Sequence, residues 1–310
     1  MHLYLVLIPV WYDMSILRSK KAQSAMEYLL TYGWAVLIIT IVLAALSYLG
    51  VFNPLTFAPR SAPGACSVHR PQGPQSLEDI SLQGVCNGEI PETVTGFNPN
   101  IGSYIQIPSS ALLNSNSMFS ISAWVYLNQP ITDQGMILGT YLGNYQGFHL
   151  FRTSSTAGFQ IGEGSSNAQN AQIYVSSSYF PLNKWVFIAG TYNGFTMTYY
   201  INGKPMASLN GVTAWSWASQ PFEIGREAWC ACKRMDGMVS NMQFYNASLD
   251  GTAIATLYSE GIGGSPVNLQ NLLGWWPLNG NTYDYSGNGE TGNPSNVVFT
   301  GSWLNGYSVP

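Results

Sequence analysis

Charged side chains are scarce in this sequence: Asp, Glu, Lys and Arg make up 8% of its 310 residues, and the net charge is −4. Globular proteins usually contain about 25%. A protein that binds nucleic acid needs a basic patch to neutralise phosphates, and none is present. The composition therefore excludes nucleic acid as a partner. Abundant Ser, Asn, Thr and Gly with 14% aromatic residues is typical of an extracellular β protein.

Catalytic motifs are missing as well. Glycan-cleaving enzymes use paired carboxylates, but no Glu-x-Asp-x-x-Glu array occurs, and Glu223 and Glu227 lie four residues apart. His69 and His149 have no nucleophile motif nearby, and no Gly-rich turn precedes a helix in a phosphate-binding pattern. Three further acids are isolated: Asp236, Asp250 and Asp284. We therefore expect a protein that is not an enzyme and requires no cofactor.

Only four cysteines are present, all beyond the hydrophobic N-terminal segment. An even number there is typical of an oxidising compartment. Cys66 and Cys86 enclose a Pro- and Gly-rich loop, and we predict that they pair. Cys230 and Cys232 enclose one residue, so they form a strained bond, pair elsewhere or stay free. Their spacing also fits half of a zinc site, but no other Cys or His pair complements it, so zinc is not expected.

Charge is absent altogether from Tyr28 to Pro59. The apolar residues there predict a helix over 23–53, roughly 45 Å long, which is enough to cross a bilayer. Asn53-Pro54 ends it, because proline cannot donate a backbone hydrogen bond. Basic residues precede the span (Arg18, Lys20 and Lys21) and favour a cytoplasmic N-terminus. The expected location is the cell membrane, with the rest of the chain outside the cell.

The segment Ser19-Lys-Lys-Ala-Gln-Ser-Ala-Met-Glu-Tyr-Leu-Leu30 resembles the class III signal peptide of archaeal type IV pilin-like proteins. The resemblance implies that a prepilin peptidase cuts between Ala22 and Gln23 and leaves the helix on the protein. Glu27 would then neutralise the new amine of Gln23 in its own or a neighbouring subunit. Alternatively, Glu27 lies in the lipid headgroup region. An ordinary secretory signal fits less well, because no small-residue cleavage site follows the apolar run.

Residues 1–22 would form the leader. The stretch Leu3–Trp11 is too short to span a membrane. A start at Met14 would give a short basic leader instead, so residues 1–13 are interpreted as an artefact of start-site choice.

Residues 54–94 are predicted to be a Pro-rich linker that includes the Cys66/Cys86 loop. Short strands separated by Gly, Asn and Ser follow, which indicates a sandwich. In Phe119–Leu127 every second residue is apolar, and Asn193-Gly194 predicts a tight hairpin. Residues 253–258 are the one expected short helix.

The ordered motifs of this region resemble the laminin-G-like, concanavalin A-like jelly roll. They are Gly102–Pro108, Phe119–Val125, Lys184–Tyr192, Tyr200–Lys204, Phe222–Gly225 and Met235–Tyr245. The implied fold over 95–310 is an all-β jelly-roll sandwich, preceded by the single long hydrophobic helix. Gly274–Gly280, with Asp284–Gly289, resembles the segment that opens such domains, but it lies near the C-terminus. We interpret it as a permuted first strand of the same sandwich.

Three tryptophans are candidate ligand-binding residues, since Trp215 and Trp217 lie on one side of an extended segment and Trp229 follows. Sugar rings stack on exposed indoles, although the three could equally belong to the core. Asp284, Asn288 and Glu290 offer oxygen ligands for Ca²⁺, or form an Asx-type turn. Asn246 begins the one N-glycosylation sequon.

The expected function is a pilin-like surface subunit that displays a lectin-like domain for adhesion or for recognition of glycans or proteins. Its partners would be the membrane and copies of itself or other pilin-like subunits. One alternative is a monomeric membrane-anchored binding protein. A third is a glycan hydrolase.

Overall fold

The computed structural model describes residues 30, 32–47, 90–108, 118–131, 135–140, 146–162, 171–212, 221–227, 230 and 232–310, and only the backbone of 66–68 and 78–80. The chain divides into two compact units, Met1–Pro59 and Arg60–Pro310. Each unit is described by itself.

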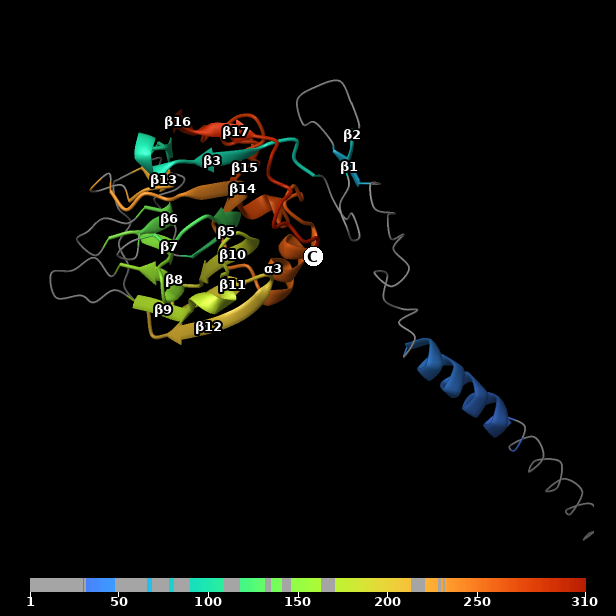
Figure 1. Ribbon diagram of the computed structural model, residues 1–310. Helices are drawn as coiled ribbons and strands as arrows, with labels where there is room; N and C mark the ends of the chain where they lie inside the picture. Colours follow the sequence, from blue (N-terminus) through green and yellow to red (C-terminus); the bar gives the residue numbers. More distant parts are fainter. Residues whose placement is uncertain are drawn as a thin grey trace, which may run out of the picture. The chain divides into compact units, whose positions relative to one another are not determined.

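The N-terminal unit contains a helix described over residues 32–47 (Figure 1). Large apolar side chains are exposed along it, including Trp34 (61%), Ile38 (57%) and Ile41 (59%). Over the described part of the chain, no helix combines the length and apolar character that crossing a bilayer requires. The span expected over 23–53 is therefore not supported by the described helix, and the remaining residues of that range lie outside the description.

The second unit contains a sandwich of two antiparallel sheets (Figure 1). The first sheet has the order β12-β11-β10-β5-β14-β3-β17, with β15 also pairing β14, and the second has β16-β4-β13-β6-β7-β8-β9. The first sheet consists of β3 Val94–Phe97, β5 Phe119–Leu127, β10 Trp185–Tyr192, β11 Thr196–Ile201, β12 Lys204–Asn210, β14 Gly237–Tyr245, β15 Leu272–Trp276 and β17 Val298–Thr300. The second consists of β4 Tyr104–Ile107, β6 Met136–Gly139, β7 Phe148–Arg152, β8 Thr156–Ile161, β9 Ala171–Ser176, β13 Phe222–Ile224 and β16 Asn293–Ser295.

Besides the sandwich strands, the second unit contains a two-stranded sheet, three 3-10 turns and one short α-helix in its described residues. β1 (Cys66–Val68) and β2 (Glu78–Ile80) pair with each other. The single turns of 3-10 helix are η2 Pro99–Ile101, η4 Ser177–Tyr179 and η5 Leu269–Asn271, and the short α-helix predicted over 253–258 is α3, Gly251–Ser259.

The main core lies between the two sheets and follows from the period of two along each strand. The alternate residues predicted to share one face of β5 all belong to this core. At its centre, the Phe119 ring lies 4.6 Å from that of Phe148 on the second sheet. The predicted all-β sandwich is confirmed.

A second apolar cluster covers the other face of the first sheet. Trp124 and Tyr126, the intervening residues of β5, belong to it together with Leu257 of α3. Tyr258 stacks on Trp124, with the ring centroids 5.6 Å apart. Near the C-terminus, the Trp303 carbonyl accepts a hydrogen bond of 2.8 Å from the indole N–H of Trp185. The central strands of the first sheet are therefore buried on both faces: every residue of β5 and β10 is buried, whereas the edge strand β12 is largely exposed.

Two predicted features concern chain turns and the C-terminal segment. Asn193-Gly194 joins β10 to β11, with Gly194 at φ +91°. β15 pairs with the Met242–Tyr245 half of β14, while β3 pairs with Gly237–Val239 on the same strand. The segment that resembles an opening strand thus lies within the first sheet, and its origin by permutation stays a prediction.

The core between the sheets gives the first testable prediction. Phe119→Ala removes a fully buried ring and should lower the free energy of unfolding by about 3–5 kcal/mol, through lost burial and the cavity left behind. Denaturant titration measures the change. Phe195→Ala is the control, because this ring is 53% exposed and its loss should change stability by about 0.5 kcal/mol or less. Equal effects of the two substitutions would contradict the assigned core.

Candidate functional site

The few charges of the chain concentrate in one place. Of eleven basic and fifteen acidic residues in 310 positions, six lie between Glu223 and Asp236. This stretch contains the end of β13 and the connection to β14, residues 225–236, which we name the rim loop. The backbone N–H of Met235 donates to the Gly225 carbonyl at 2.7 Å, so the two ends of the rim loop meet.

A buried ion pair fixes the start of the rim loop. The Arg226 guanidinium donates to both carboxylate oxygens of Glu223, Nε to Oε2 at 2.7 Å and an Nη to Oε1 at 2.9 Å. Gln106 on β4 donates to the same Oε1 at 3.1 Å, and Arg226 lies 3.3 Å above the Tyr104 ring. Bidentate contacts of this kind are strong and directional, and the hydrogen bonds from Arg226 to Glu223 raise the pKa of Arg226.

A second ion pair and a disulfide hold the middle of the rim loop in place. Lys233 Nζ lies 3.0 Å from Glu227 Oε2, and the Glu227 N–H donates to the Cys232 carbonyl at 3.1 Å. Cys230 and Cys232 are bonded to each other, which answers the pairing that the sequence left open. Glu227, Cys230 and Cys232 place ligand atoms within 4.8 Å of one another. Zinc binds thiolates, and the two sulfurs are joined in the disulfide instead.

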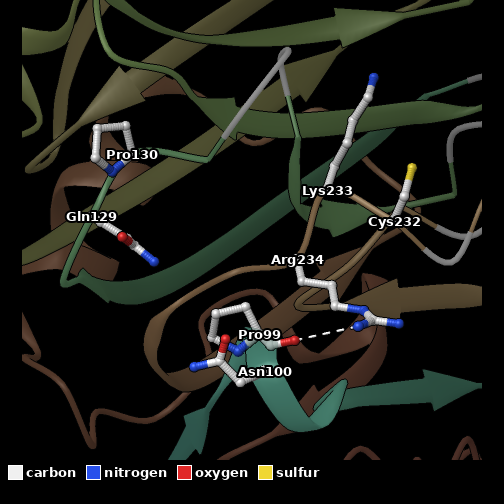
Figure 2. Close-up of a pocket in the computed structure, with 7 residues that line it drawn as sticks. All are labelled: Pro99, Asn100, Gln129, Pro130, Cys232, Lys233 and Arg234. Atoms are coloured by element: carbon white, nitrogen blue, oxygen red, sulfur yellow. Dashed lines mark hydrogen bonds between the residues drawn. The ribbon is translucent and has the colours of Figure 1, made fainter.

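A hollow with a volume of about 570 Å³ lies beside the rim loop, and we name it the rim pocket (Figure 2). Three connections far apart in sequence form it: η2 between β3 and β4, the turn after β5, and the rim loop. In Figure 2 Arg234 extends to Pro99, and its Nη1 donates to the Pro99 carbonyl at 3.3 Å. The lining residues are Pro99, Asn100, Gln129, Pro130, Cys232, Lys233 and Arg234.

A second hollow of about 370 Å³ shares Asn100 with the rim pocket. Asn128 and Asp236 line it, and the Asn128 amide donates to Asp236 Oδ1 at 2.6 Å. The carboxylate nearest in sequence to Arg234 is therefore held by an amide in the neighbouring hollow.

A polar row crosses the second sheet next to the rim loop. The strand register places Gln106, Glu223, Gly139, His149 and Gln160 side by side. His149 is fully buried, and its pKa falls to about 3, first through burial and then through the nearby charge of Lys233. It is neutral at pH 7. No role for His149 was predicted from the sequence, because the polar row forms only when the strands pair.

The candidate Ca²⁺ ligands are placed in a hydrogen-bonded turn. Asp284 Oδ1 accepts from the N–H groups of Trp275 (3.0 Å) and Ser286 (2.9 Å), and Oδ2 accepts from the N–H of Glu290 at 3.0 Å. The Asn288 amide donates to the carbonyls of Leu272 and Leu273 at 3.1 Å. This is the Asx-type arrangement offered as the alternative, and Ca²⁺ binding stays a prediction.

Other predicted residues are not brought to the rim pocket. Asn246 follows β14; it is half-buried, and its side-chain oxygen is buried. Several predictions lie outside the described residues or side chains: Trp215, Trp217 and Trp229 as ligand-binding residues, the Cys66–Cys86 disulfide, and Ala22, Gln23 and Glu27 in processing and assembly. Sequence reasoning missed Arg234, Asn100 and Gln129. The concentration of charge at 223–236 was the one available signal.

The buried imidazole predicts a pH dependence of stability. Above pH 6.5 His149 is neutral in both states; as the pH falls below 6.5 the unfolded chain takes up a proton that the folded chain takes up only near pH 3. The free energy of unfolding should therefore fall through this window, by on the order of 4 kcal/mol in all. His149→Gln should flatten that slope in denaturant titrations between pH 7 and pH 4. An unchanged slope would mean that the imidazole is protonated in the folded protein.

Comparison with known proteins supports the fold described above. The chain has no match among curated proteins. In solved structures it is similar to a candidate carbohydrate-binding protein from Bacteroides ovatus, with 14% identity over 73% of this chain and 63% of the other and a TM-score of 0.52. It is also similar to the heptameric SAP-like pentraxin of Limulus polyphemus, with 13% identity over 69% and 97% of the two chains and a TM-score of 0.50.

The chain matches less than two thirds of the length of the Bacteroides protein. The family model for the concanavalin A-like lectin/glucanases superfamily matches residues 99–255, half of the chain. That range contains strands of both sheets, from β4 to β14, and the whole rim loop. The chain belongs to the concanavalin A-like lectin/glucanases superfamily.

Proposed function

We propose that this protein binds glycans through the rim pocket and does not cleave them. The observation that carries the proposal is a preformed pocket of about 570 Å³ lined by amide and cationic side chains. Ligand sites commonly measure about 300–1,000 Å³ and use a few polar groups to orient the ligand. The family to which the chain belongs includes lectins, and the Bacteroides relative is named for carbohydrate binding, which adds support.

The carboxylates beside the pocket argue against hydrolysis. A glycosidase needs one carboxyl group that can give a proton and a second that can attack or activate water. Glu223 is held by Arg226 and Gln106, and Glu227 by Lys233. Neither Glu223 nor Glu227 belongs to the lining of the rim pocket, and the cation that holds each one occupies carboxylate oxygens that catalysis would need. A hydrolase would therefore need other acids.

The pocket residues give a direct test. The purified full-length chain, kept in solution with a mild detergent, is applied to an array of plant, bacterial and animal glycans. Asn100→Ala with Gln129→Ala removes two exposed amides of the pocket and should weaken binding of any glycan detected by at least tenfold (about 1.4 kcal/mol). Gln270→Ala is the matched control, because it removes an exposed amide on η5. Equal binding by all three proteins would place the site elsewhere.

We further propose that the N-terminal segment displays the domain on the cell surface as a pilin-like subunit. Two features support it: the motif around Ala22, Gln23 and Glu27, and the exposed apolar side chains of the helix over 32–47. Contiguous exposed apolar surface is costly in water, so copies of the helix or lipid are its expected surroundings. The alternative is a monomeric anchored protein with the same outward orientation.

Processing and assembly separate these alternatives. If the pilin-like proposal holds, N-terminal sequencing of the native protein will begin at Gln23, and Glu27→Ala will abolish filaments while the chain stays in the membrane fraction. The expected reason is loss of the charge pair with the Gln23 amine. Ser24→Ala is the control and should leave filaments intact. An uncleaved, detergent-soluble monomer would instead favour the anchor.

A further inference from the structure

We propose that the rim pocket recognises an acidic saccharide, and that Arg234 is the specificity residue that binds its carboxylate or sulfate group. The inference rests on the glycan-binding function proposed above and names the ligand class of the same pocket.

The charges around the rim loop leave one cation, Arg234, without an acidic partner among the described residues. Arg226 is neutralised by Glu223 and Lys233 by Glu227. Arg234, which is exposed, forms no ion pair with any residue the structure describes. The pocket lining contains Lys233 and Arg234 but no carboxylate. Arg234 is therefore the one cation of the pocket lining that has no carboxylate partner among the described residues.

The Arg234 side chain is held in place by one hydrogen bond and keeps further N–H donors for a ligand. Its Nη1 donates to the Pro99 carbonyl, the one hydrogen bond of this side chain within the described region. Gly102 lies beside the guanidinium: a Cβ there would be in van der Waals contact with the guanidinium carbon at 3.4 Å, and the φ of +70° favours glycine at this position. A guanidinium offers five N–H donors, so a parallel pair remains for a carboxylate or sulfate.

Amide side chains line the rim pocket opposite Arg234 and suit the uncharged part of a saccharide. Figure 2 shows Gln129 and Pro130 across the hollow from Arg234, Asn100 at its base, and Lys233 pointing away. Amide side chains both donate and accept hydrogen bonds, which suits sugar hydroxyls. An anion at Arg234 would leave the sugar ring near Asn100 and Gln129. A saccharide with one acidic group matches this division, whereas a simple inorganic anion would use Arg234 alone.

Matched ligands test the inference on the full-length chain in detergent. Calorimetry compares tetragalacturonate with its methyl ester, and 3′-sulfated lactose with lactose, so that each pair differs in the anionic group and the two pairs separate carboxylate from sulfate. The acidic member of at least one pair should bind tenfold or more tighter at low salt, and the difference should shrink at 0.5 M NaCl. Arg234→Gln should remove the difference while keeping residual binding. Lys204→Gln, on exposed β12, is the control and should preserve it.

The outcomes distinguish the two proposals. Equal affinity for acidic and neutral members, or a preference that survives Arg234→Gln, overturns the inference and leaves glycan binding intact. If the wild-type protein unfolds cooperatively on heating, and is therefore folded, but binds neither pair, the result counts against both the acidic-saccharide inference and glycan binding. Thermal unfolding of Arg234→Gln should match the wild type, because the side chain is exposed.

Discussion

Burial of both faces of the central strands of the first sheet is the constraint on which the rest of the structure depends. One face packs against the second sheet and the other beneath α3 and the C-terminal segment. A strand buried on both sides has no position for an unpaired charge, and β5 carries none. The double cover accounts for the absence of charged residues from the central strands β5, β10 and β14.

Charges that remain are therefore placed where strands end. The rim loop holds five of them, and two of its three cations are matched to a carboxylate. Buried ion pairs contribute little net stability, because desolvation offsets their attraction. They do fix geometry. Glu223 with Arg226, and Glu227 with Lys233, set the path of the backbone that leads to Arg234. We infer that positioning this loop is their main effect.

Alternation and turn chemistry made most of the sandwich predictable. The alternation in Phe119–Leu127 identified the core face of β5, and Asn193-Gly194 identified the hairpin between β10 and β11. Both signals are local in the sequence. The rim pocket was not predictable in this way. Asn100, Gln129 and Arg234 meet only once β3, β5 and β14 are adjacent. His149 is a similar case, since its polar neighbours come from other strands. The sequence instead predicted Trp215, Trp217 and Trp229 as ligand-binding residues, and these lie outside the residues that the structure describes.

The rim pocket is formed by connections between strands, whereas a site on a sheet face would be formed by residues that also pack the core. Sheet faces here are needed for stability, so a change in ligand specificity there would disturb packing. The rim pocket takes its polar groups from exposed positions, and its walls are set by a disulfide and two ion pairs behind them. Specificity can then change by substitution at Asn100, Gln129 or Arg234 with the core unaltered. This separation of stability from recognition favours the rim as the place for the proposed binding, because the central strands of the first sheet are covered on both faces.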